Sequence, residues 1–165
     1  MTFVTYRSKT GIKKTKNCVQ TPKFLLDYLT TTFGTLYDPC PILNEKFDTK
    51  KHTDGLKQDW KKETENEKVV YINPPFSSTK FWFIKAHDER KRGVKSVLLV
   101  KTTIANNKFF TKYCQNCQLV FFDFRFPFVG FTTFPVFKLM FVIFDPENLV
   151  PSYSSITKDA FSKFD

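Results

Sequence analysis

The chain has 165 residues, 41% of them hydrophobic and 25% charged, which indicates one globular domain and argues against a disordered chain. Lysine and arginine total 26 against 16 acidic residues, and the resulting charge of +10 favours a polyanionic partner such as nucleic acid. No apolar run reaches the roughly 18 residues of a membrane span and residues 1–18 lack an apolar signal core, so we expect a cytoplasmic chain that is not secreted and has no membrane partner.

The first 18 residues predict a flexible basic arm. They carry five basic side chains and no acidic one, and such a segment can follow phosphates, with Lys13 and Lys14 among the contacts. Lysine greatly outnumbers arginine and phenylalanine is abundant, as the codon bias of an AT-rich genome would also produce, so part of the charge can reflect composition alone. After the arm we expect one domain over residues 19–145 and a tail over residues 146–165.

The first half of the expected domain contains one clear helix. Apolar residues three and four positions apart predict a helix over residues 23–29, with Thr21 as its cap and Pro22 in its first turn. A short strand is expected at residues 35–37. The polar and charged segment 41–68 favours short strands and loops over long helices.

The second half of the domain alternates strands with helices. The expected elements are a strand at 69–72, a helix at 79–92, a strand at 96–100, a helix at 106–114 and strands at 118–124 and 135–144. This alternation implies crossover connections and a mainly parallel sheet, whereas the last two strands can pair as an antiparallel hairpin. The tail is expected to be irregular until a short helix at 157–164.

The strand at 69–72 ends in Asn73-Pro74-Pro75-Phe76, a sequence typical of methyltransferases that act on a planar amine. The exocyclic amine of adenine is a weak nucleophile because its lone pair is delocalised into the ring, so a catalyst must hold both N–H bonds with acceptors. The side-chain oxygen of Asn73 and the carbonyl of Pro74 can supply two, and Phe76 can stack on the base for about 1–3 kcal/mol. Two prolines after a strand are also ordinary turn chemistry.

Polar side chains follow three of the expected parallel strands. Asp38, Asn73 and Lys101 each come directly after one of them. Ligands of open α/β sheets bind beyond the carboxyl ends of the strands. We therefore expect these three side chains to line one crevice.

The cysteines give no metal motif. Cys114 and Cys117 form one C-x-x-C pair, Cys18 and Cys40 do not form a second, and His52 and His87 are far from the pair in the sequence. A structural zinc site needs about four ligands. We expect no metal and interpret the pair as core or helix-end residues.

Four further motifs accompany Asn73-Pro74-Pro75-Phe76. They are Gln20-Thr21-Pro22, Leu36-Tyr37-Asp38-Pro39-Cys40, the segment with Asp54-Gly55-Leu56 and Gln58-Asp59-Trp60, and Lys85-Ala86, with Asn44, Arg125 and Phe128 as single matching residues. Any one motif is weakly specific, but five in order are strongly so. With this series the chain resembles the phage-type Dam family of DNA adenine methyltransferases over roughly residues 19–145.

The resemblance implies a minimal single-domain, Rossmann-like class I methyltransferase with a mostly parallel sheet and an antiparallel C-terminal strand. It implies transfer of a methyl group from S-adenosylmethionine to the exocyclic amine of adenine in double-stranded DNA, and a phage or viral source. The implied catalytic residues are Asn73, Pro74, Pro75 and Phe76. The implied cofactor contacts are Thr21 and Pro22 at the methionine end, Asp38 with Pro39 at the ammonium, Asp54 at the ribose and Asp59 at the adenine amine. The candidates for nucleic-acid contact are Lys101, Arg125, Lys13 and Lys14.

Simpler explanations exist for some of these residues. Thr21 would cap a helix in any protein, Asp38-Pro39 and Asp54-Gly55 are common turn pairs, and Trp60 fits a core position. The chain also lacks the Gly-x-Gly loop usual in class I enzymes, and about 35 residues between Asp38 and Asn73 are too few for two full βα units.

Other functions stay open at this stage. An RNA adenine and a glutamine amide in a protein offer a similar planar amine, and a methyltransferase fold without activity could serve as a nucleic-acid-binding subunit. No separate target-recognition domain is visible, so the sequence specifies neither the target site nor the oligomeric state.

Overall fold

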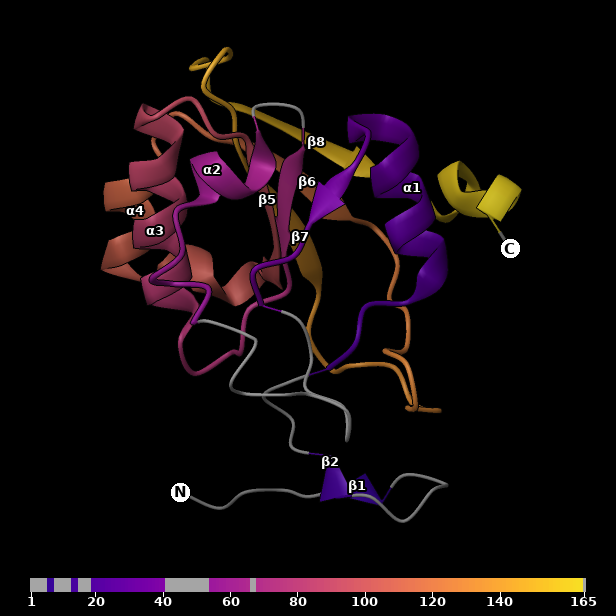
Figure 1. Cartoon of the computed structure of the whole chain (residues 1–165). Helices are drawn as coiled ribbons and strands as arrows, with labels where there is room; N and C mark the ends of the chain where they lie inside the picture. The colour runs from indigo at the N-terminus through magenta and orange to yellow at the C-terminus, as the bar shows by residue number, and fades with distance from the viewer. Residues whose placement is uncertain (1–5, 8–12, 15–18, 41–53, 66–67, 165) are drawn as a thin grey trace.

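The computed structural model describes residues 6–7, 13–14, 19–40, 54–65 and 68–164. The helices are α1 (Lys23–Phe33), α2 (Trp60–Thr64), α3 (Thr79–Lys91) and α4 (Lys108–Tyr113), with 3-10 helices η1 (Thr102–Asn106) and η2 (Lys158–Phe164). The strands are β1 (Tyr6–Arg7), β2 (Lys13–Lys14), β3 (Leu36–Tyr37), β4 (Val69–Ile72), β5 (Ser96–Lys101), β6 (Gln118–Phe122), β7 (Leu139–Phe144) and β8 (Ser152–Ile156). β1 pairs antiparallel with β2, and the other strands form one six-stranded sheet (Figure 1).

The six strands lie in the order β3-β4-β5-β7-β6-β8. β3, β4 and β5 pair in parallel, β7 is antiparallel to both of its neighbours, and β8 is parallel to β6. The carboxyl ends of β3, β4, β5 and β6 therefore lie at the same edge of the sheet. The predicted mixed α/β fold is confirmed, with β7 as the antiparallel strand near the carboxyl terminus and β6–β7 as the predicted hairpin pair.

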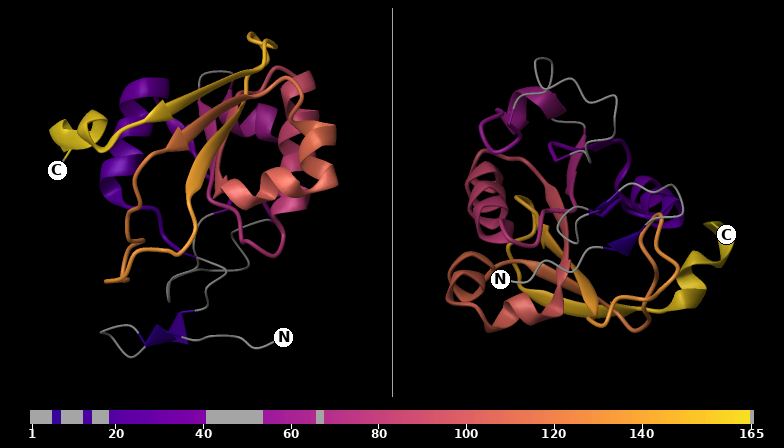
Figure 2. Two further views of the ribbon diagram at one scale, coloured as in Figure 1. Left: turned by 180° about the vertical axis from the view of Figure 1, so that it is seen from behind. Right: turned by 90° about the horizontal axis from the view of Figure 1, so that it is seen from below.

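Helices cover both faces of this sheet because its strands are apolar on both sides. In β4, Val70 and Ile72 pack with Trp60 of α2 and Phe83 of α3, whereas Tyr71 packs on the opposite face with α1. Figure 2 shows α1 and η2 on one side of the sheet and α2, α3 and α4 on the other.

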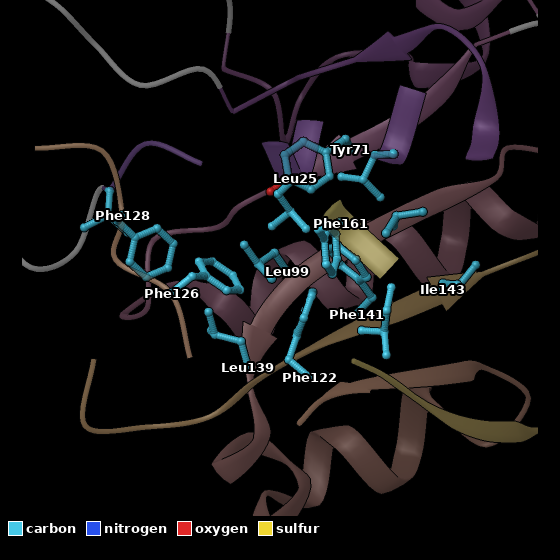
Figure 3. Close-up of a cluster of buried hydrophobic side chains, with 14 of the residues drawn as sticks. Leu25, Tyr71, Leu99, Phe122, Phe126, Phe128, Leu139, Phe141, Ile143 and Phe161 are labelled. Atoms are coloured by element: carbon cyan, nitrogen blue, oxygen red, sulfur yellow. The ribbon is translucent and has the colours of Figure 1, made fainter. Parts of the chain in front are cut away.

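The core on the α1 face is mainly aromatic (Figure 3). The ring of Phe122 meets that of Phe141 at 4.9 Å and that of Phe126 at 5.3 Å, both nearly edge to face. Phe161 brings η2 into the same cluster and is only 2% exposed. Such pairs each contribute about 0.5–1.5 kcal/mol beyond area burial, so the end of the chain is held by the core.

The start of α1 differs from the prediction that Thr21 caps it. Pro22 occupies the N-cap and no side chain caps the helix, while the carbonyl of Pro22 accepts from the N–H groups of Leu25 and Leu26. The hydroxyl of Thr21 is instead bonded to other residues, as described below. Gly34 ends the helix at φ +83°, and its N–H donates to the carbonyl of Thr30 at 2.9 Å.

The expectation of an irregular segment before the last helix is wrong for β8. Ser152–Ile156 pairs in parallel with β6, from Gln118 opposite Ser152 to Phe122 opposite Ile156. Only Ile156 of this strand is buried, so backbone pairing at the sheet edge, and not an apolar pattern, stabilises it. The predicted final helix is present as η2, and the predicted strand at 135–144 begins only at Leu139.

Two segments that carry predictions fall outside the described residues: most of the expected arm and residues 41–53. The described part of segment 41–68 contains the short helix α2 and no long helix, as expected. Within the described ranges, no helix combines the length and apolar character needed to cross a membrane.

Candidate active site

Asn73 stands directly after β4, at the carboxyl edge of the sheet, and is half-buried. Its Nδ2 donates to the carbonyl of Val19 at 2.6 Å and to Oγ1 of Thr21 at 3.2 Å. A primary amide has two N–H donors, so both are used inside the protein. No described residue donates to Oδ1, which makes this oxygen the group that Asn73 can offer to a ligand.

Thr21 links Asn73 to the core. It is buried, and its hydroxyl lies 2.7 Å from the phenol oxygen of Tyr71 in a hydrogen bond that either group can donate. Tyr71 is fully enclosed, and desolvation raises the pKa of its phenol, with the charge of Asp38 acting in the same direction and the bond to Thr21 against it. The neutral phenol and the Thr21 hydroxyl thus hold the amide nitrogen of Asn73 on the protein side.

The turn after Asn73 supplies the second expected acceptor. The carbonyl of Pro75 is used, because it accepts from the N–H of Ser78 at 3.0 Å and from the hydroxyl of Thr79 at 3.3 Å. In the described part of the chain, nothing donates to the carbonyl of Pro74. The two prolines bring no N–H of their own, so Oδ1 of Asn73 and this carbonyl are two acceptors to which no described residue donates.

Phe76 already has contacts on its ring. Nζ of Lys101, at the end of β5, lies 3.9 Å from the ring centroid, and Phe137 meets the ring edge-on at 5.4 Å. The same Nζ lies 4.3 Å from the ring of Phe137. Cation–π attraction of about 0.5–2 kcal/mol holds such an ammonium, so a base that stacks on this face of Phe76 has to displace Lys101.

Asp38 follows β3, the neighbour of β4 in the sheet. Its Oδ1 accepts the N–H of Cys40 at 2.8 Å. Desolvation by the surrounding protein raises the pKa of this carboxyl to about 6, and the hydrogen bond from the Cys40 N–H offsets part of the rise. The residue as a whole remains exposed to solvent. A bound cation would reverse this effect by favouring the ionised carboxylate.

Asp54 is brought to Asp38 by a close backbone contact. A Cβ on Gly55 would lie 1.9 Å from the carbonyl oxygen of Pro39, so only glycine fits at this position. Asp54 is exposed; its Oδ1 accepts the N–H of Leu56 at 3.1 Å. Asp38 and Asp54, each predicted to contact the cofactor, therefore belong to two adjoining turns.

Asp59 is engaged elsewhere. Its carboxylate pairs with the guanidinium of Arg92 at 2.9 Å and accepts the N–H of Lys62 as the cap of α2. The hydrogen bond from Arg92 holds the pKa of Asp59 below its usual range. Arg92 follows α3, whereas Asn73 precedes that helix, and no described contact joins Asp59 to the residues around Asn73.

Trp60 is fully buried and packs in the core, as its position suggested. Its indole N–H donates to the carbonyl of Gly55 at 2.9 Å, its ring stacks on Trp82 at 6.3 Å, and Nζ of Lys85 lies 5.4 Å from the ring. Lys85 also pairs with buried Glu89 at 2.6 Å. The Asp-Gly-Leu and Trp motifs thus anchor the turn beside Asp38 to α3.

The basic candidates are dispersed. Arg125 is exposed in the connection between β6 and β7, and its Nη1 donates to the carbonyl of Pro135 at 3.5 Å. Lys13 and Lys14 form β2, of which only the backbone is described. Lys101 is the one among them that the structure places against Phe76.

Sequence reasoning missed three contributors. Tyr71 was included in a buried strand without a polar role, the carbonyl of Val19 leaves no sequence signal, and Phe137 lay inside a predicted strand. An aromatic residue two positions before a strand-end asparagine is the signal that could have indicated Tyr71, because alternate side chains of a strand share one face.

Cys114 and Cys117 are buried beside the end of α4, as expected. The described residues contain no group of three or more His, Cys, Asp or Glu placed to hold a metal ion.

A family model described as DNA N-6-adenine-methyltransferase (Dam) matches residues 7–134. The chain belongs to this family. The matched range includes every predicted site residue, from Lys13 to Arg125, and ends within the β6–β7 connection. No curated protein matches the chain.

Proposed function

We propose that the protein transfers a methyl group from S-adenosylmethionine to the exocyclic amine of adenine in DNA. The observation that carries this proposal is the state of Asn73: both N–H groups of its amide are bonded to Val19 and Thr21, and its Oδ1 has no donor in the described part of the chain. An acceptor fixed in this way beside a second acceptor, the carbonyl of Pro74, suits an amino group and no anionic or carbonyl ligand.

The two acceptors act on the nucleophile. Hydrogen bonds from the adenine amine to Oδ1 of Asn73 and to the carbonyl of Pro74 would draw its lone pair out of the ring and aim it at the methyl donor. Phe76 would hold the flat face of the base after Lys101 moves aside. Transfer is then a direct displacement in which positioning and preorganised dipoles supply the rate, and the amine loses its proton to water afterwards.

The cofactor fits part of the expected residue set. Bound S-adenosylmethionine would supply a methyl group activated by a sulfonium. The carboxylate of Asp38 suits its ammonium, since Oδ1 has only the Cys40 N–H as a donor among the described residues and ionisation of the group gains from a cation. Asp54 suits the ribose hydroxyls from the adjoining turn, and we retain Pro22 and Pro39 as further proposed contacts.

Two predicted cofactor contacts receive less support. The hydroxyl of Thr21 is bonded to Tyr71 and Asn73, so only its methyl group and backbone are left for the cofactor. Asp59 is paired with Arg92 and caps α2. We retain both as proposals that a binding measurement on each variant can reject.

The decisive experiment is transfer of tritium from labelled S-adenosylmethionine to unmethylated DNA, followed by digestion and identification of the labelled nucleoside. We expect label in N6-methyladenine. Label that appears only in RNA or in a glutamine side chain would refute the DNA assignment, and cofactor binding without any transfer would favour a binding subunit.

Asn73→Ala tests the residue that carries the proposal. It removes one acceptor and leaves Asp38 untouched, so cofactor affinity should stay within about twofold while turnover falls by about 100-fold or more, as for loss of one preorganised group. Full turnover in this variant would refute the role of Asn73.

A further inference from the structure

The ammonium of Lys101 lies in a corner formed by two aromatic rings. Its Nζ is 3.9 Å from the ring centroid of Phe76 and 4.3 Å from that of Phe137, over both rings. The centroids of the two rings are 5.4 Å apart and their planes are inclined at 83°. Two rings at nearly a right angle border a point on two sides, so the ammonium fills the corner between them.

Three segments of the chain build this corner, and the sheet holds them together. Phe76 follows β4, Lys101 ends β5 and Phe137 precedes β7, and β5 pairs with both of the other strands. The N–H of Thr102 donates to the carbonyl of Lys138 at 3.0 Å, which joins the chain just after Lys101 to the chain just after Phe137. The three side chains of the corner are half-buried, so a ligand from solvent can reach them.

An ammonium and a base compete for the same aromatic face. Cation–π attraction holds Lys101 on Phe76, and stacking would hold a base there. A base can therefore enter only if the ammonium leaves, and the ease of this exchange depends on where the ammonium goes. Release into water loses the attraction to both rings, whereas release to a phosphate replaces that attraction by an ion pair.

A base that belongs to DNA brings a phosphate with it, since one sugar links the two. The lysine side chain is a compact charge on a flexible four-carbon stem. Nζ of Lys101 can thus leave the rings for an anion at the rim of the corner while the backbone of β5 stays in place. A nucleoside offers no such anion. The corner is therefore built to distinguish bases by the charge that accompanies them.

We propose that Lys101 is a specificity-determining residue, which occupies the site of the target base in the free protein and leaves it only for a base whose phosphate binds the ammonium. This inference rests on the proposed function, because it takes Phe76 as the ring on which the target adenine stacks. It adds a role in substrate choice: adenine nucleosides are excluded from the site that accepts adenine in DNA.

The test measures the Kd of deoxyadenosine and of deoxyadenosine 5′-monophosphate for the full-length protein by NMR titration. Saturating S-adenosylhomocysteine is present throughout, so that neither ligand binds at the proposed cofactor site. The wild type should prefer the monophosphate by about tenfold or more. Lys101→Met retains a straight side chain without the charge. It should bind the nucleoside about tenfold more tightly than the wild type does and show a preference of about twofold or less for the monophosphate.

Two control variants separate a cation on the rings from charge in general. Lys101→Arg keeps a cation that stacks on aromatic faces, so it should retain the wild-type preference for the monophosphate. Lys138→Met removes the same charge from an exposed residue of the neighbouring segment. It should bind both ligands as the wild type does.

Equal binding of the nucleoside by the wild type and by Lys101→Met would overturn the proposal, as would a failure of Lys101→Met to bind the nucleoside at its solubility limit. A preference for the monophosphate that Lys138→Met loses and Lys101→Met keeps would overturn it too. Tritium transfer to unmethylated DNA is measured in parallel with the wild type. The expected binding pattern without transfer refutes the proposed function alone, and transfer without an effect of Lys101→Met on nucleoside binding refutes this inference alone.

Discussion

Replacing Thr21 by valine tests how the orientation of Asn73 is set. Valine keeps the shape of threonine and removes the hydroxyl that accepts from Nδ2 of Asn73 and bonds to Tyr71. The variant leaves a buried phenol and one amide hydrogen without a partner, which costs about 1–3 kcal/mol of folding free energy. The bond to the carbonyl of Val19 remains, so the amide is held by one hydrogen bond where the wild type has two.

The expected effect on the reaction follows from that lost bond. A net hydrogen bond is worth about 0.5–1.5 kcal/mol, and each 1.36 kcal/mol of barrier is about tenfold in rate. We therefore expect kcat to fall by about two- to tenfold, while the Kd for S-adenosylmethionine, measured by calorimetry, does not change. Thr21→Ser retains the hydroxyl and is the matched control, with kcat close to wild type.

The opposite pattern would refute this reasoning. If Thr21→Val weakened cofactor binding and left kcat unchanged, the hydroxyl would act on the cofactor, as the family resemblance implied. Tyr71→Phe separates the two cases further, because it removes the second partner of Thr21 without touching a proposed cofactor contact. It should lower kcat alone.

Three other changes test the surroundings of the site. Gly55→Ala places a Cβ 1.9 Å from the carbonyl oxygen of Pro39, so urea denaturation should show a loss of about 1–3 kcal/mol. The raised pKa of Asp38, about 6, means that its protonated form favours folding: this contribution is full below the ordinary value near 3.8 and is lost as pH rises through 6. Asp38→Asn should remove that pH dependence from the unfolding free energy and also the rise in cofactor affinity expected between pH 5 and 7. Glu89→Ala leaves Lys85 without its buried partner and should cost about 3 kcal/mol in the same denaturation assay.

The sequence predicted the strands and helices that position the site because each has a strong local signal. The apolar run at β4 and the 3–4 periodicity of α1 are determined by burial, which sequence patterns record directly. β8 could not be predicted in this way. Four of its five residues are exposed, and what stabilises it is backbone pairing with β6, which any residue type can provide.

The candidate site was predicted in part for the same reason. Asp38, Asn73 and Lys101 follow strands that could be recognised, and the parallel pairing of β3, β4 and β5 places them after three neighbouring strands at one edge of the sheet. Their partners could not be derived. The carbonyl of Val19 and the ring of Phe137 reach Asn73 and Phe76 from segments 54 and 61 residues away, and such contacts depend on the packing of the whole domain.

Residues of a family motif can contact the ligand or stabilise the fold, and the Asp-Gly-Leu and Asp-Trp segments illustrate the difference. Asp54 and Asp59 of the Asp-Gly-Leu and Asp-Trp segments were interpreted as cofactor contacts, yet their neighbours Gly55 and Trp60 have structural roles. Gly55 leaves room for the carbonyl of Pro39, and Trp60 connects that turn to α3 through its hydrogen bond to Gly55. Asp59 continues the connection to Arg92. Through these contacts the packing of α3 reaches the turn that carries Asp38, so a substitution at Trp60 would displace a proposed ligand of the ammonium without contacting the cofactor. A motif at the right spacing therefore identifies the family more securely than it identifies which of its residues touch the ligand.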